Sequence, residues 1–194
     1  MKILHIITSM NKGGAENFLY KLSLQSNKNN NIKIFIITLL KFGYYENLLR
    51  QNNIKIYSLD IRNKYFIFLK IKKLINLIKS INPDVIQTWM YHSNLIGGLA
   101  AKFIGTKKII WTIRHGKLIF FKSKITTILI NYLSMFFSKL IPTKIVYCSY
   151  SSKKIHENFG YNKNISRVIY NGFNFDEFIK NKKLKKKIRN KFKI

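Results

Sequence analysis

Short apolar runs alternate with longer helical patterns along almost the whole chain, and this alternation constrains the fold more than any other feature. A β-α repeat of this kind predicts an α/β domain, a Rossmann-like three-layer arrangement with a mainly parallel sheet flanked by helices. Ligands bind such sheets at the carboxyl ends of the strands. The strand-like runs are 2–8, 32–40, 54–59, 84–88, 108–113, 144–148 and 165–169, and the helical patterns are 15–25, 44–51, 65–80, 93–104, 118–140 and 151–158.

A glycine pair, Gly13-Gly14, follows the first strand-like run and a short loop, and it opens the first helix. Glycines at a helix start leave backbone N–H groups uncovered at the positive end of the helix dipole, where a phosphate or another anion binds. An ordinary tight turn is the alternative explanation of the pair. Glu16 lies in the first helical turn, where dipole compensation and capping account for it without a role in a site.

The charge is strongly one-sided, with 36 Lys and Arg residues against 7 Asp and Glu residues, a net charge of +29. Such a field favours nucleic acid, anionic lipid or phosphorylated substrates. The chain is also rich in Lys, Asn and Ile together, so we interpret the charge mainly as a composition bias of A+T-rich coding. A membrane-facing role comes next, and nucleic acid is unlikely because no nucleic-acid-binding motif accompanies the basic residues.

The remaining composition favours a cytoplasmic protein. Cys148 is the single cysteine of the chain, so an internal disulfide is excluded. It lies in an apolar run, which predicts a buried structural thiol, and we expect a reducing compartment. The N-terminal apolar run ends at Thr8 without a cleavage site, which is typical of a first strand and not of a signal peptide. The segment 118–140 is interrupted by lysines and polar residues, so it predicts a helix packed on the sheet, or an amphipathic surface that touches lipid head groups.

Three groups of segments carry a resemblance to a known family. They are 2–8 with 13–16, 83–97 with 110–116, and 146–151 with 168–172 and Phe178. In this order and at these spacings they resemble the N-terminal, acceptor-side domain of the family 4 glycosyltransferases of GT-B architecture. In this family two Rossmann-like domains face each other across a cleft. The C-terminal domain holds most of the nucleotide-sugar donor and a pair of glutamates seven residues apart.

The resemblance implies a domain at residues 1–178 and a basic linker or tail at 179–194 that leads toward a C-terminal donor-binding domain. The spacing of that glutamate pair does not occur in this sequence, so we expect no independent catalysis. The implied activity is a retaining transfer of a sugar from a nucleotide-diphosphate sugar to a hydroxyl acceptor, in surface polysaccharide or glycolipid synthesis, without a metal or other cofactor. A separate C-terminal half is a possible partner. The alternative is a non-catalytic module that binds an acceptor or an anionic membrane at the inner face.

The resemblance also implies a role for the residues that follow the strand at 108–113. In the family, a histidine at the position of His115 contacts the transferred sugar or the acceptor, so His115 is the candidate catalytic residue. Arg114 beside it could pair with a phosphate through its two-pronged guanidinium, or be an ordinary surface arginine. Gly13 and Gly14 match the glycine loop that approaches the donor diphosphate.

Two weaker candidates lie at the same predicted sheet edge. His92 could position an acceptor hydroxyl, and a capping role explains it equally well. Asn171 and Gly172 match the family motif before the linker, where they could line the cleft; a turn with positive φ is the alternative. Of the other histidines, we expect His5 to pack within the sheet and His156 to lie on the surface of a late helix.

Overall fold

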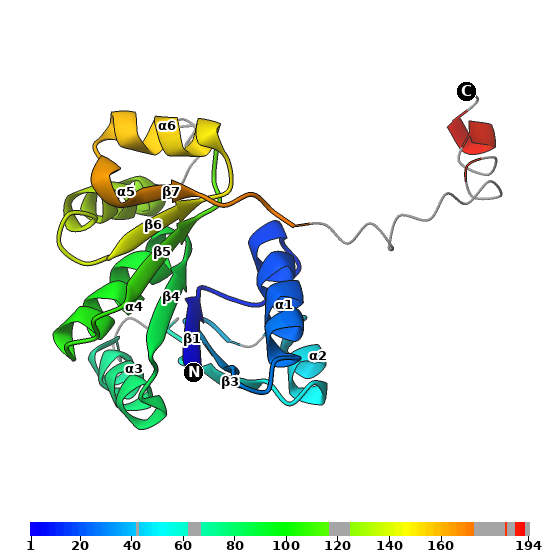
Figure 1. Ribbon diagram of the computed structural model, residues 1–194, viewed down its shortest axis with the longest axis horizontal. Coiled ribbons are helices and arrows are strands. Elements are labelled where there is room, and N and C mark those ends of the chain that lie inside the picture. The colour runs from blue at the N-terminus through cyan, green and yellow to red at the C-terminus, as the bar shows by residue number, and fades with distance from the viewer. Residues whose placement is uncertain (42, 62–66, 117–124, 173–184, 186–188, 193–194) are drawn as a thin grey trace.

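The computed structural model of the protein describes residues 1–41, 43–61, 67–116, 125–172, 185 and 189–192 (Figure 1). Within these residues, seven strands form one sheet in the order β3-β2-β1-β4-β5-β6-β7, and every neighbouring pair is parallel. The predicted α/β fold is therefore confirmed. The strands are β1 (Lys2–Ile7), β2 (Lys33–Thr38), β3 (Lys55–Ser58), β4 (Val85–Trp89), β5 (Ile109–Ile113), β6 (Lys144–Tyr147) and β7 (Ser166–Val168).

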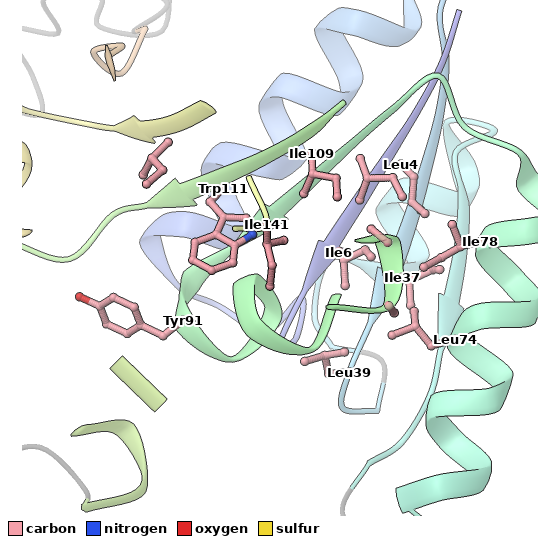
Figure 2. Packing of buried hydrophobic residues seen from close by; sticks show 14 of the residues in the cluster. Leu4, Ile6, Ile37, Leu39, Leu74, Ile78, Tyr91, Ile109, Trp111 and Ile141 are labelled. Carbon is pink, nitrogen blue, oxygen red and sulfur yellow. The ribbon is translucent and has the colours of Figure 1, made fainter. Parts of the chain in front are cut away.

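Helices cover both faces of this sheet. In Figure 1, α1 (Gly14–Asn27) and α2 (Glu46–Gln51) lie on one side, and α3 (Ile67–Ile81), α4 (Met90–Phe103) and α5 (Ile125–Phe137) lie on the other. Helix α6 (Tyr150–Phe159) follows β6. Side chains alternate across the pleat of each strand, so Leu4 and Ile6 of β1 join the core under α3 and α4, while Ile7 joins the core under α1. Figure 2 shows the first of these cores around Trp111.

The start of one helix differs from its predicted position. The helix predicted at 93–104 begins at Met90, directly after β4, and Met90 takes the uncommon left-handed φ of 71° at this junction. The helix predicted at 118–140 is described only as α5, because residues 117–124 lie outside the described residues. The predicted boundary between 178 and 179 also lies outside them. Over the part of the chain that is described, none of the helices is long and apolar enough to cross a membrane.

The strand order places a topological switch point between β1 and β4. Strand β1 is followed by α1 on one face of the sheet, and its neighbour β4 is followed by α4 on the opposite face. Loops that leave adjacent strands toward opposite faces separate at the carboxyl edge, which is where ligands bind in open α/β sheets. Thr8 and Ser93 connect the two sides of this point, since their hydroxyl oxygens are 3.2 Å apart.

His5 lies buried within the sheet, as predicted, and accepts a hydrogen bond of 3.3 Å at Nδ1 from Nε1 of Trp89. Burial lowers the pKa of His5 from 6.5 to about 4. The folded protein therefore binds fewer protons here than the unfolded chain does between these two pH values. Stability that is complete above pH 6.5 is lost as the pH falls, and this one group accounts for about 3 kcal/mol of unfolding free energy by pH 4.

Urea denaturation of the wild type and of His5→Asn at pH 7 and at pH 4 measures this effect. Asparagine can still accept the Trp89 hydrogen bond but cannot be protonated, so the variant is expected to lose less stability on acidification than the wild type. Other buried histidines affect both proteins equally and cancel in the comparison. Equal losses in the two proteins would contradict the assignment to His5.

Candidate functional site

The predicted glycine pair does open a helix at the carboxyl edge. Gly13 is the N-cap residue of α1, with an extended φ of −169°, and Gly14 is the first helical residue. Both residues are exposed, and a Cβ built on Gly14 would meet no atom within 4 Å. No side chain caps this helix start from the N-cap position. The open space beside Gly14 therefore allows an anionic group to approach the backbone at this helix start.

Glu16 reaches back over Gly13 from the first turn of α1. A Cβ built on Gly13 would stand 2.9 Å from the carboxyl carbon of Glu16, and closer still to one of its oxygens. Only glycine at position 13 leaves room for this arrangement of the Glu16 side chain. The carboxylate thus compensates the helix dipole, as the sequence indicates, and its charge also acts to raise the pKa of His115.

Arg114 follows β5 and contacts three separate parts of the chain. The central carbon of its guanidinium lies 3.6 Å from the centroid of the Phe18 ring on α1 and 5.1 Å from that of Trp89 on β4. Its Nη1 donates a hydrogen bond to Oδ1 of Asn171, beyond the end of β7. The structure therefore brings together two candidate residues, Arg114 and Asn171, that are 57 positions apart in the sequence.

The environment of Arg114 is well suited to holding an anion. Aromatic rings fix the plane of the guanidinium, and burial lowers the pKa of Arg114 because the charged form loses hydration. Its Nε is buried and has no hydrogen-bond partner among the described residues. A buried N–H group without a partner is costly, so an acceptor at this position would stabilise the site.

His115 stands next to Arg114, with its ring exposed on one side and covered by Tyr91 on the other. The two rings are stacked, with centroids 5.8 Å apart and planes inclined by 26°. The backbone oxygen of His115 accepts a hydrogen bond of 2.7 Å from the Ser152 hydroxyl on α6. Desolvation lowers the pKa of His115, and the Glu16 carboxylate acts in the opposite direction. At neutral pH the imidazole is therefore uncharged and can both donate and accept a hydrogen bond.

The predicted surface position of His156 is wrong. His156 is buried, with only 2% of its surface exposed, and its Nε2 lies 2.6 Å from the Tyr91 hydroxyl. Its Nδ1 lies 2.7 Å from the backbone oxygen of Ser152, which can only accept, so Nδ1 carries a proton. Burial lowers the pKa of His156, so the ring is neutral and Nε2 accepts from Tyr91. Tyr91 and His156 thus form a buried pair directly behind His115.

Sequence reasoning missed this pair, although a signal was present. Ser152 and His156 are four positions apart on α6 and lie on its buried face, where the apolar Phe159 also packs partly. Tyr91 immediately precedes the candidate His92, but the sequence contains no sign that its hydroxyl has a partner 65 positions further on.

The remaining candidates make fewer contacts with the other residues of the site. His92 lies in the first turn of α4, half-buried, and burial lowers its pKa, but its ring has no hydrogen-bond partner among the described residues. Gly172 is exposed, next to Asn171. The alternative of a positive-φ turn at this pair is wrong, since the glycines with positive φ in the described chain are Gly105 and Gly160. Cys148 is half-buried instead of fully buried, and its sulfur lies 3.9 Å from the backbone oxygen of Arg114.

Two hollows of about 420 and 430 Å³ lie at the opposite, amino edge of the sheet, and Asn82 and Asp84 line both of them. Neither hollow includes a helix start or a candidate histidine. No three His, Cys, Asp or Glu side chains gather as a metal site would require anywhere in the described ranges. The chemistry-bearing side chains therefore concentrate at the carboxyl edge, in the loops after β1, β4, β5 and β7.

Replacement of Glu16 by glutamine is expected to lower the pKa of His115, because the neighbouring carboxylate raises it in the wild type. Desolvation remains, so the imidazolium should form only at more acidic pH. An NMR titration of the His115 ring measures the change. Glu46→Gln is the matched control, since Glu46 lies in the first turn of α2 and is paired with Arg50. An unchanged or raised His115 pKa in Glu16→Gln would contradict this geometry.

Comparison with known proteins agrees with this arrangement. The sequence model of the family described as Glycosyltransferase Family 4 matches residues 12–177. The search of curated proteins finds no significant match. Among solved structures, HepE from Anabaena in complex with UDP-glucose is similar to this chain with a TM-score of 0.78 and 18% identity, over 99% of this chain and 50% of that one.

Two other similar structures extend the comparison. The lipopolysaccharide outer core galactosyltransferase WaaB, in its apo form, has a TM-score of 0.64 and 19% identity, over 90% of this chain and 47% of that one. The UDP-GlcNAc 2-epimerase from Methanocaldococcus jannaschii has a TM-score of 0.61 and 15% identity, over 88% of this chain and 46% of that one. At these identities the similarity shows the fold. The chain spans about half the length of the solved structures it matches.

Proposed function

The chain belongs to glycosyltransferase family 4, and we propose that it forms the N-terminal half of a GT-B sugar-transfer cleft. The carboxyl edge of its sheet would face a nucleotide-diphosphate sugar and a hydroxyl acceptor, and the reaction would retain the anomeric configuration. The observation that carries this proposal is the convergence of the α1 start, Arg114, His115 and Asn171 at one sheet edge.

The donor diphosphate gains negative charge as the bond to the sugar breaks, so the protein must supply positive charge or N–H groups there. The Gly13-Gly14 start of α1 offers backbone N–H groups. Arg114 offers a fixed cation, and its buried Nε–H has no hydrogen-bond partner among the described residues. These groups act without a metal ion in this proposal. The Glu16 carboxylate would have to move away from Gly13 when the diphosphate approaches, because two anions would otherwise share one position.

His115 would contact the transferred sugar or the acceptor hydroxyl. Its neutral ring, held by Tyr91 and by the Ser152 hydrogen bond, can donate to one hydroxyl and accept from another. His92 would lie on the acceptor side, at the start of α4. Asn171 would hold Arg114 in place, and the small exposed Gly172 beside it would line the cleft.

Most donor contacts and the family's glutamate pair would come from a second, C-terminal half. The chain spans about half of the matched structures, HepE among them with UDP-glucose bound, which supports a division of this kind. Catalysis would therefore need that half, with residues 1–178 as the acceptor-side domain and 179–194 as the segment leading to it. The acceptor would be a polysaccharide or glycolipid precursor at the cytoplasmic face of a membrane.

A thermal-shift panel of nucleotide-diphosphate sugars, nucleoside monophosphates and free sugars tests the binding half of this proposal. A ligand that binds only the folded state raises the melting temperature. We expect the diphosphate sugars at millimolar concentration to raise Tm above the shift seen with free sugars. No rise in Tm with any ligand, or an equal rise with all of them, would refute the proposed cleft. Robust sugar transfer by the chain alone would refute its dependence on a second half.

A further inference from the structure

His115 is an exposed residue that is nevertheless held at two points. Its ring stacks on that of Tyr91 on α4, with centroids 5.8 Å apart. Its backbone oxygen accepts a hydrogen bond of 2.7 Å from the Ser152 hydroxyl on α6. An exposed side chain on a loop ordinarily moves among several rotamers. Two helices that follow β4 and β6 therefore restrict a residue that follows β5.

His156 connects the two residues that hold His115. Its Nε2 accepts a hydrogen bond of 2.6 Å from the Tyr91 hydroxyl, and its Nδ1 donates one of 2.7 Å to the backbone oxygen of Ser152. Tyr91, Ser152 and His156 are each at most 2% exposed. Contacts thus run in a closed circuit from the exposed His115 through its two supports to one buried imidazole.

Packing alone does not explain an imidazole at position 156. The rings of Tyr91, Tyr147 and Tyr161 surround it, with centroids 5.8, 5.4 and 5.2 Å from its own. An apolar side chain could fill this aromatic enclosure without the cost of burying two polar nitrogens. The imidazole adds direction, because hydrogen bonds at both nitrogens fix its ring and so fix where the Tyr91 hydroxyl must point. The orientation of the Tyr91 ring, on which His115 stacks, is set in this way.

We propose that His156 is a positioning residue for His115 and acts on it through Tyr91 and Ser152. The stack covers one face of the His115 ring and leaves the other exposed at the carboxyl edge. Groups that contact a reacting substrate must be held to within about 0.5 Å, and neighbouring hydrogen bonds provide that precision. The use of this orientation in sugar transfer rests on the proposed function, whereas the orientation itself does not.

Tyr91→Phe tests the proposal by removing a single oxygen atom. The ring at position 91 remains, but its bond to His156 is lost, so its orientation is no longer fixed. Protons that stack on an aromatic face resonate at lower frequency, so the His115 ring protons report the stack in an NMR spectrum. We expect them to move toward the positions of a freely exposed histidine. The dissociation constant for UDP-glucose should rise about twofold to tenfold, the contribution of one neutral hydrogen bond.

Tyr161→Phe is the matched control. Tyr161 also packs on His156, is 2% exposed, and donates a hydrogen bond of 2.7 Å to Oδ1 of Asn131. The variant therefore loses a comparable buried hydrogen bond, while the ring that supports His115 keeps its hydroxyl. Both tyrosine variants should have a lower Tm than the wild type, but only Tyr91→Phe should change the His115 ring signals. Lost stability alone would affect these signals equally in the two variants.

Two substitutions of His156 extend the test. His156→Leu removes both hydrogen bonds and should release the His115 ring as Tyr91→Phe does. In His156→Gln the amide oxygen can still accept from the Tyr91 hydroxyl, so this variant should retain more of the wild-type His115 signal. Circular dichroism establishes that each variant is folded, and if His156→Leu is not, the tyrosine variants decide the question.

Unchanged His115 ring signals in Tyr91→Phe would overturn the proposal, and so would equal changes in Tyr91→Phe and Tyr161→Phe. The ring signals are measured without ligand, which separates this proposal from the proposed function. If the signals change as expected but the wild type does not bind UDP-glucose, the proposed function fails and the positioning of His115 stands. If the wild type binds UDP-glucose and Tyr91→Phe alters neither the ring signals nor the affinity, only the positioning role fails.

Discussion

Replacement of Trp111 by alanine is expected to lower the free energy of unfolding by about 3–5 kcal/mol, the range found for removing a large buried aromatic side chain. Trp111 lies at the centre of β5 with no exposed surface, between Tyr91, Ile141 and the neighbouring strands (Figure 2). Helix α4 approaches the indole through Gly98, where a Cβ would stand only 2.7 Å from Nε1. Neither the helix nor the sheet can close around the cavity that alanine would leave.

Trp111→Phe provides the matched control for this prediction. The indole N–H of Trp111 is buried without a hydrogen-bond partner in the described part of the chain, so phenylalanine keeps most of the ring volume and removes an unsatisfied donor. We expect this variant to lose less than about 1.5 kcal/mol. Urea denaturation measures both variants. A loss in Trp111→Ala no larger than that in Trp111→Phe would contradict this description of the core.

Replacement of Arg114 by alanine is expected to weaken binding of the proposed nucleotide-diphosphate donor, with UDP-glucose as the probe, tenfold to hundredfold, as the loss of one charge-assisted hydrogen bond of about 1.5–3 kcal/mol implies. The Phe18 ring and Asn171 hold the guanidinium in one orientation at the carboxyl edge, so little conformational entropy is lost when an anion binds. Titration calorimetry, or the thermal shift as a function of ligand concentration, measures the change.

Arg114→Lys separates charge from geometry. Lysine keeps the positive charge but has neither the planar group that stacks on Phe18 nor the paired donors, so we expect it to restore only a small part of the affinity. Arg167→Ala is the control, since Arg167 on β7 is exposed and donates to its neighbour Ser166. Wild-type affinity in Arg114→Ala would exclude Arg114 from the site.

The fold was predictable because its determinants are local. Apolar runs separated by helical periods predict parallel strands, and the Gly13-Gly14 pair predicts the start of α1, where the structure has it. The position of Arg114 and His115 after β5 also follows from the end of an apolar run. In a parallel sheet, the residues that directly follow each strand all lie at the carboxyl edge, so these residues could be assigned to one region from sequence order alone.

Contacts between distant segments could not be predicted in the same way. The bond from Arg114 to Asn171 depends on β5 and β7 flanking β6, which no local pattern specifies. The buried position of His156 depends on a partner hydroxyl on α4, Tyr91. A polar residue is buried where its hydrogen bonds are satisfied, and that condition is set by the assembled structure and not by the neighbours in sequence. The burial of Asn131 on α5 could not be predicted for a similar reason, because its side chain accepts a hydrogen bond from the distant Tyr161 hydroxyl.

The central claim, that the carboxyl edge of this sheet is half of a sugar-transfer cleft, is tested most directly by an NMR titration. The isotopically labelled chain is titrated with UDP-glucose, and amide shifts are followed residue by residue. The account predicts saturable shifts at Gly13, Gly14, Arg114 and His115. Shifts confined to the hollows at the amino edge around Asn82 and Asp84, or no shifts at millimolar ligand, would contradict it.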